Sequence, residues 1–284
     1  MIIFLRKLIV SLIFVFSLSG CATVVTSITA QLAEDLSWSI LNSNDVETVR
    51  EAIPAYLVMI DSFLRSSPDD PALLMAASSL NGAFAIFTDE ERSKLLTTKS
   101  FDYAARAACV SKPAMCGLND AKFEDFKIDV DQLEAEDVQF AYTLAVAWTS
   151  WMQANSDDWN VIAQLSKVKY LMNRIIELDE TWDNGGPHLY MGGLETVLPA
   201  SMGGNPEVGR AHFERAIALG EGRFLMTKVV FAENYAKLVF DKALHDQLLR
   251  EVIAANPVAE GMTLTNTVAQ KQAKALLADS DDYF

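Results

Sequence analysis

The stretch "LTNTVAQKQAKALL", residues 264–277, decides the fold class of this chain. Its apolar residues recur every three or four positions, which in a helix places them on one face. These residues are Leu264, Val268, Ala269, Ala273, Leu276 and Leu277. Their spacing predicts an amphipathic α-helix that buries one stripe against the rest of the protein.

The same helical period recurs along the chain. Clusters of Asn, Asp, Ser, Pro and Gly separate the periodic segments, at "SSPDDP", "ANSDDW", "DNGGP", "MGGNP" and "AANP", and these are turn and cap signals. Few runs alternate β-branched with polar residues, so the sequence offers no obvious sheet. We therefore predict an all-α fold. The predicted helices are Val46–Phe63, Ala72–Phe87, Glu91–Val110, Val138–Met152, Asn160–Leu178, Glu207–Leu219, Leu225–Phe240, Ala243–Ala254 and Leu264–Leu277.

Weak internal repetition favours an array of helical pairs. A tetratricopeptide repeat places a small residue, an aromatic residue four later and Ala three after that, where its helices pack closely. "GRAHFERAIAL" (209–219) fits this spacing, and "VKYLMNRIIELDE" (168–180) follows the same register with larger residues. The two registers lie 41 residues apart, measured from Leu178 to Leu219, which exceeds the period of about 34. An array of degenerate tetratricopeptide-like pairs, an α-solenoid, and a general helical bundle both remain open on this evidence.

The N-terminus has the pattern of an export signal. Arg6 and Lys7 precede the apolar run 8–18, which is shorter than the roughly 20 residues that span a bilayer. The segment "LSGC" (18–21) resembles the lipobox of bacterial lipoproteins, which implies that Cys21 is acylated and becomes the mature N-terminus. A plain signal peptide with a chance cysteine is the alternative. We divide the chain into a signal peptide (1–20), an anchor with tether or first helix (21–44) and a helical domain (45–284).

The residue after the lipobox bears on the destination of the protein. Asp at this position commonly retains lipoproteins of diderm bacteria in the inner membrane, whereas this chain has Ala22. We therefore expect a lipid-anchored periplasmic protein, at the outer rather than the inner membrane.

The charge of the chain argues against two classes of partner. The formal net charge is −15, and removal of residues 1–20, which carry two basic and no acidic residues, lowers it by two to −17. A body this acidic is repelled by nucleic acid and by anionic lipid surfaces. We expect no nucleic-acid partner, and membrane contact through the lipid anchor only.

The remaining two of the three cysteines fit an exported protein. Cys109 and Cys116 in "ACVSKPAMCG" would lie about 10 Å apart in a straight helix, too far to bridge, but Pro113 between them breaks the helix. An oxidising compartment then favours a Cys109–Cys116 disulfide over free thiols. Neither His nor further Cys lies nearby in sequence, which argues against a metal site.

No motif of an enzyme stands out. The sequence lacks a Gly-x-Ser-x-Gly elbow, a phosphate-binding loop and a His-Glu-x-x-His zinc motif. His188, His212 and His245 are scattered, and each is interpreted as a surface or hydrogen-bonded histidine. Asp241 and His245 lie one helical turn apart and could pair, yet no nucleophile accompanies them. We predict a protein that is not an enzyme and has no cofactor and no metal.

A binding module remains, and its aromatic residues are the candidate contacts. They can line a cleft between curved helical pairs, or they can simply fill the seams between helices. We consider Trp182–Gly193 with the "SMGGNP" loop the best region, and expect His188, after a Gly-Gly-Pro turn, to be exposed. The candidate binding residues are Trp148, Trp151, Asn155, Trp182, His188 and Tyr190.

From about Ala141 to Phe284 the chain resembles the periplasmic lipoproteins of TRAP transporters, the T-component (TatT) family. The segments that carry the resemblance are "LAVAWTSWMQANSDDW", "IIELDETWDNGGPHLYMGG", "LPASMGGNPEVGRAHFERAIAL", "FAENYAKLVFDKALHDQLLREVI", "LTNTVAQKQAKALL" and "DDYF". The resemblance implies cryptic tetratricopeptide pairs, partnership with a TRAP solute-binding protein, and a homotrimer with openings for a small hydrophobic or organic-acid ligand. An envelope scaffold lipoprotein that joins other proteins is the competing hypothesis.

The lipobox yields a first testable prediction. Cys21→Ser should abolish lipid attachment and leave the helical content of the domain unchanged, because residue 21 precedes it. Incorporation of labelled palmitate and far-UV circular dichroism would measure the two effects. Palmitate entering the Cys21→Ser protein would contradict the lipobox assignment.

Overall fold

The computed structural model describes residues 38–284, and this part of the chain is all helical, without a strand. The predicted all-α class is confirmed. The signal peptide and the lipidation site Cys21 lie outside the described residues. A helical turn at 38–41 precedes the following elements: α2 (Val46–Ser66), α3 (Pro71–Ala85), α4 (Glu90–Ser111), η1 (Pro113–Met115), α5 (Phe123–Asp131), η2 (Ala135–Asp137), α6 (Val138–Ala154), α7 (Trp159–Ile162), α8 (Leu165–Asp179), α9 (Trp182–Glu195), η3 (Ala200–Met202), α10 (Pro206–Leu219), α11 (Met226–Val230), the π-helix η4 (Phe231–Ala236), α12 (Lys242–Ala254), α13 (Thr263–Ala278) and α14 (Ser280–Tyr283).

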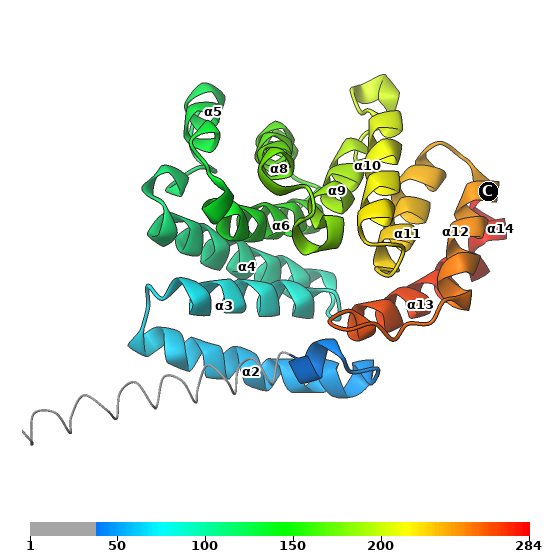
Figure 1. The fold of residues 1–284 in the computed structure, drawn as a ribbon, viewed down its shortest axis with the longest axis horizontal. Helices are drawn as coiled ribbons and strands as arrows, with labels where there is room; N and C mark the ends of the chain where they lie inside the picture. The colour runs from blue at the N-terminus through cyan, green and yellow to red at the C-terminus, as the bar shows by residue number, and fades with distance from the viewer. Residues whose placement is uncertain (1–37) are drawn as a thin grey trace, which may run out of the picture.

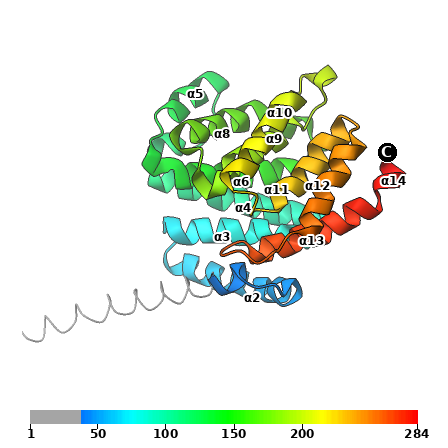
Figure 2. The same cartoon turned by 45° about the vertical axis from the view of Figure 1, so that its right-hand side comes forward.

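The helices form a curved array whose last long helix returns to the first. Helices α2, α3 and α4 lie in successive layers, α6 to α10 continue from them, and α13 comes back beside α2 (Figures 1 and 2). The Gly261 N–H donates to Asn42 Oδ1 at 2.9 Å, and Leu264 packs against the buried cluster of Val49 and Ile53. The last long helix, α13, therefore lies beside the first one, α2.

Trp148 is central to the largest hydrophobic cluster, which α4, α5, α6, α8 and α9 share. Its side chain is fully buried, with its ring 5.4 Å from that of Phe101 and 6.3 Å from that of Phe126. The indole N–H donates to Gln164 Oε1 at 2.8 Å, so the buried polar atom has a partner. A second cluster joins α9 to α13, and two smaller ones join α2, α3 and α4.

Helices α9 and α10 approach each other closely at two glycines. A Cβ added at Gly192 would lie 2.7 Å from the ring of Phe213, which is fully buried. On the facing helix, a Cβ added at Gly209 would lie 2.7 Å from Thr196 Cγ2. Glycine at both places lets the two backbones come close enough for Phe213 to fill the interface.

The structure corrects several predicted helices. The segment Asn160–Leu178 is interrupted between α7 and α8, where the Gln164 side chain is bound to Trp148. The segment Leu225–Phe240 contains a π-helix and ends at Phe240 with φ of 59°. The acidic α5 and the glycine-rich α9 were not predicted, because their composition hides the helical period.

The predicted cysteine pair is joined in the structure. The sulfurs of Cys109 and Cys116 are 2.01 Å apart and their Cα atoms 4.3 Å apart. Helix α4 ends at Ser111, and η1 starts at Pro113, so the chain turns back between the two cysteines.

Among residues 38–284, no helix combines the length and apolar character that crossing a membrane would need.

The α9–α10 contact yields a prediction with a matched control. Gly192→Ala should destabilise the protein by about 1–3 kcal/mol, because the added methyl group overlaps Phe213 in a packed core. Gly193→Ala, whose added Cβ would lie 3.6 Å from Asn234 Nδ2, should be neutral or stabilising by up to about 1 kcal/mol. Denaturant unfolding of both variants measures the difference, and equal stabilities would refute this account of the interface.

Candidate functional site

Helix α9 begins with three consecutive residues in the left-handed region. The φ angles of Asp183, Asn184 and Gly185 are 48°, 57° and 84°, a conformation that Gly adopts freely and that Asp and Asn tolerate best among the others. The right-handed helix then starts at Gly186 and Pro187, and Pro is favoured in a first turn. The turn and cap signal predicted at "DNGGP" thus forms a turn, and this turn sets the entry of a buried helix that was not predicted.

A tyrosine pair supports this entry. The Tyr142 hydroxyl of α6 donates to Asp183 Oδ2 at 2.8 Å, and the rings of Tyr142 and Tyr190 meet edge to face at 6.0 Å. Burial raises the pKa of the Asp183 carboxyl, although the Tyr142 hydrogen bond lowers it. Burial also raises the pKa of Tyr190 to about 12. Asp183 as a whole residue is exposed.

Two histidines meet across the α9–α10 interface. His188 Nδ1 lies 2.8 Å from His212 Nδ1, and His188 Nε2 lies 3.2 Å from Glu180 Oε2. Glu180 also accepts a hydrogen bond from Arg215 Nε at 3.1 Å. The expectation that His188 is exposed is wrong, because α10 covers it and leaves 7% of its surface accessible. Burial lowers the pKa of both imidazoles.

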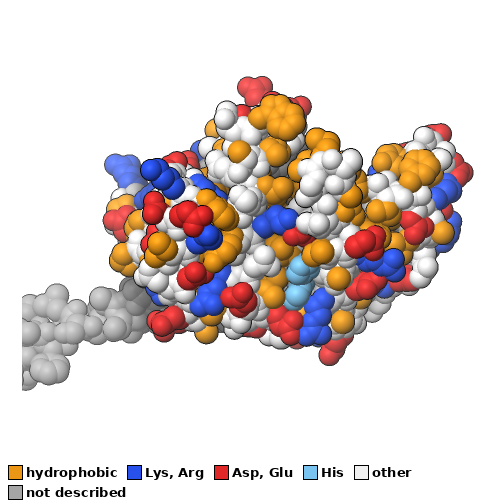
Figure 3. All heavy atoms as spheres, turned by 90° about the horizontal axis from the view of Figure 1, so that it is seen from above, with side chains coloured by type: hydrophobic (Ala, Val, Ile, Leu, Met, Phe, Trp, Pro, Cys, Tyr) orange, Lys and Arg blue, Asp and Glu red, His pale blue; other side chains and the backbone are white. Residues whose placement is uncertain are grey.

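The histidine pair opens onto a shallow surface recess. Figure 3 shows histidine at the surface between acidic and basic side chains. His245 is fully buried, so the visible histidine belongs to the His188–His212 pair. Val208 and Ala211 give the recess an apolar part, as both belong to the exposed side of α10. The residues that line it are His188, Glu207, Val208, Ala211, His212 and Arg215.

The other predicted binding residues have structural contacts. Trp148 is in the core, and Trp151 stacks on Phe101 with ring centroids 5.4 Å apart. The Asn155 side chain donates to the Trp151 carbonyl at 2.8 Å and so closes the end of α6. Trp182 is half-buried against the largest cluster. The candidate site therefore centres on Trp182, His188 and Tyr190 of α9.

Sequence reasoning missed the partners of these residues. Tyr142 and Glu180 lie 41 and 8 positions from the residues they bond, on other elements, and nothing in their local sequence marks them. The His188–His212 contact spans 24 residues, and it corrects the description of the histidines as scattered. The one hint of this contact in the local sequence is that a glycine shortly precedes each histidine, Gly186 before His188 and Gly209 before His212.

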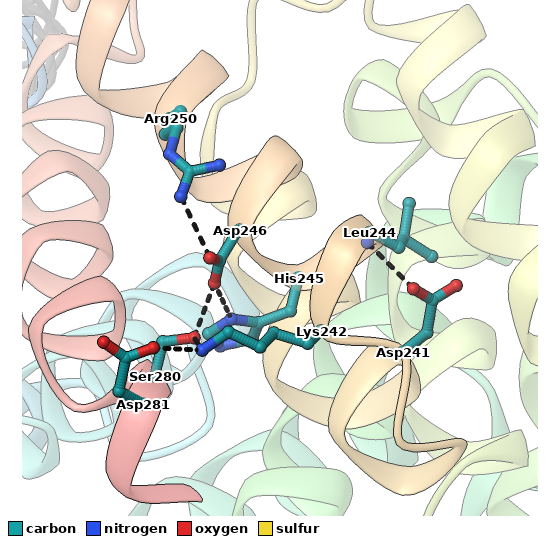
Figure 4. Close-up of polar contacts among 8 residues, drawn as sticks. All are labelled: Asp241, Lys242, Leu244, His245, Asp246, Arg250, Ser280 and Asp281. Atoms are coloured by element: carbon teal, nitrogen blue, oxygen red, sulfur yellow. Dashed lines mark hydrogen bonds and ion pairs between the residues drawn. The ribbon is translucent and has the colours of Figure 1, made fainter. Parts of the chain in front are cut away.

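The predicted Asp241–His245 pair is also wrong. Asp241 Oδ1 instead accepts the backbone N–H of Leu244 at 2.9 Å and caps α12 (Figure 4). His245 Nδ1 is 3.0 Å from Oδ1 of its neighbour Asp246. A residue at the cap has its side chain turned to the helix end, so it does not reach one turn up the helix.

Asp246 ties the C-terminal helix to α12. It accepts hydrogen bonds from Ser280 Oγ at 2.6 Å and from Arg250 Nη2 at 2.9 Å (Figure 4). Burial alone would raise the pKa of the Asp246 carboxyl, but the hydrogen bonds and the positive charges of Lys242 and Arg250 leave it lowered. The hydrogen of the Ser280 hydroxyl is thus engaged in the hydrogen bond to the Asp246 carboxylate.

Within residues 38–284, no group of three or more His, Cys, Asp or Glu side chains is placed to hold a metal ion.

Comparison with known proteins identifies a family for this chain. A sequence model of the TRAP transporter T-component family matches residues 42–284, which is nearly the whole chain. No curated protein matches it.

The Asp246 network yields a prediction. Asp246→Asn should cost about 2–3 kcal/mol, because it leaves the donors of Ser280 and His245 facing an amide without the negative charge. The lowered pKa means that this stabilisation is complete above about pH 4 and is lost as the pH falls further. Thermal unfolding at pH 7 and below 4 tests both points. Asp282→Asn, at an exposed neighbour, is the control and should change neither.

Proposed function

Because this chain belongs to the TRAP transporter T-component family, we propose that it is a non-enzymatic accessory protein of a TRAP transport system. In this proposal it binds the solute-binding protein of the system, and a small hydrophobic or organic-acid ligand is a second candidate at the same surface. The family match over residues 42–284 is the observation that carries the proposal. The homotrimer implied by the resemblance is part of the same proposal.

We place the binding surface at α9 and the recess on α10. Trp182 and Tyr190 are both half-buried, so each offers part of an aromatic face, and Val208 is 46% exposed. Aromatic residues with a polar rim are typical of the centres of protein interfaces. The recess is open rather than enclosed, which suits a protein partner better than an engulfed small molecule.

The proposed location follows from the N-terminus. Cys21 would carry the acyl chains that hold the protein in the periplasm at the outer membrane, and attachment of this kind needs two or more chains. A mature charge of −17 would keep the helical domain off an anionic lipid surface, so that the anchor alone holds it.

Binding and stability measured on the same variants test the proposal. Trp182→Ala should weaken capture of the cognate solute-binding protein at least tenfold, as loss of an aromatic anchor does. Because Trp182 is only half-buried, the substitution should lower the free energy of unfolding by less than the roughly 3–5 kcal/mol lost when a fully buried tryptophan is truncated. Trp159→Ala is the matched control, since Trp159 is 75% exposed on α7, and should leave capture unchanged.

Isothermal titration with the purified solute-binding protein and calorimetric melting give the two readouts. A large fall in the Tm of Trp182→Ala with unchanged affinity would show that Trp182 only packs in the core. Capture of envelope proteins by the mature chain, with the solute-binding protein absent, would favour the scaffold hypothesis.

A further inference from the structure

Glu180 fixes the proton arrangement of the histidine pair. Arg215 holds the pKa of the Glu180 carboxyl below its usual range, so this group is an ionised acceptor at neutral pH. A carboxylate accepts hydrogen bonds and donates none. The neighbouring His188 Nε2, at 3.2 Å, must therefore carry a hydrogen.

The 2.8 Å contact between the two Nδ1 atoms fixes the proton position on His212 as well. A neutral His188 with hydrogen on Nε2 has a bare Nδ1, which can only accept. His212 must then donate from Nδ1, and its own Nε2 is left bare. This atom has solvent access: the buried side-chain nitrogens and oxygens without a partner in residues 38–284 are Arg174 Nε and His245 Nε2.

We infer that the Glu180–His188–His212 chain is a two-stage proton sensor built into the α9–α10 interface. The first proton binds His212 Nε2, at the recess, and leaves the His188–His212 hydrogen bond in place as a charge-assisted one. The second proton can bind only at His188 Nδ1. It would set two N–H groups and two positive rings against each other at 2.8 Å, so it must break the contact between the helices.

The surrounding charges set where the two stages fall. Glu180, which directly follows α8, favours protonation of His188, while Lys169 of α8 is paired with Glu195 of α9 at 2.6 Å. Arg215 on α10 opposes protonation of His188. Burial lowers the pKa of both histidines, which places both stages below the ordinary titration range near pH 6.5.

Each stage has a different consequence for the surface. With His212 neutral, the charges that line the recess are those of Glu207 and Arg215, which cancel. The first proton makes the recess net positive, and the second separates α9, with Trp182 and Tyr190, from α10. Control of partner binding by pH through this step rests on the proposed function, whereas the proton sensor itself does not.

Nitrogen NMR of the histidine side chains tests the inference on the mature protein alone. At pH 8 we expect His188 as the Nε2–H tautomer and His212 as the Nδ1–H tautomer, which is the less common form of free histidine. On acidification His212 should titrate first. Finding His212 as the Nε2–H tautomer, or both histidines titrating together near pH 6.5, would overturn the inference.

Two substitutions at one position provide the matched comparison. Both His212→Asn and His212→Leu remove the ring that is protonated first, so in neither variant does a positive charge at position 212 oppose protonation of His188. His188 should therefore titrate at a higher pH in both variants than in the unaltered protein. A His188 titration unchanged in both variants would refute the coupling.

The unfolding temperature provides a second readout. A histidine whose pKa is lowered in the folded state binds fewer protons than in the unfolded state, so stability falls as the pH drops below about 6.5. The fall in Tm between pH 7.5 and 5.0 should shrink by at least half in a His188→Gln, His212→Asn double variant. An undiminished fall would contradict the inference, and this result is independent of whether any solute-binding protein is bound.

Discussion

The close approach of α9 and α10 is the constraint on which the candidate site depends. Without side chains at Gly192 and Gly209, the backbones come near enough for Phe213 to fill the space between them. The same approach brings His188 and His212 to hydrogen-bond distance and covers His188. A packed interface of this kind has little room for intermediate positions, so a broken contact tends to shift the whole helix rather than one side chain.

The left-handed entry of α9 is the second constraint. Two residues other than glycine with positive φ are costly, and such conformations persist only where their surroundings hold them. Here Tyr142 stabilises the left-handed conformation through its hydrogen bond to Asp183. Its hydroxyl also occupies the space that a side chain at Gly186 would need. The orientation of Trp182 and Tyr190 is thus set from α6, outside the helix that carries them.

Closure of the array relates the first and last long helices. Because α13 lies beside α2, these two helices belong to one edge of the molecule (Figure 1). The Asp246 network then fixes the last residues on α12. Helices α8, α9 and α10 lie away from α2 (Figure 1).

The sequence by itself determined the helical class, most helix positions and the family resemblance, because the spacing of apolar residues within a segment such as 264–277 is a local property. It also indicated the Cys109–Cys116 pair, since Pro113 acts locally. It failed at α9, where glycines and Pro187 resemble a loop until α10 and Tyr142 are present to pack against them. The partners of His188 were decided only by the tertiary structure, because Glu180, His212 and Arg215 meet through helix packing. Contacts between helices depend on the crossing of whole elements, and the sequence of a single segment carries no record of that geometry.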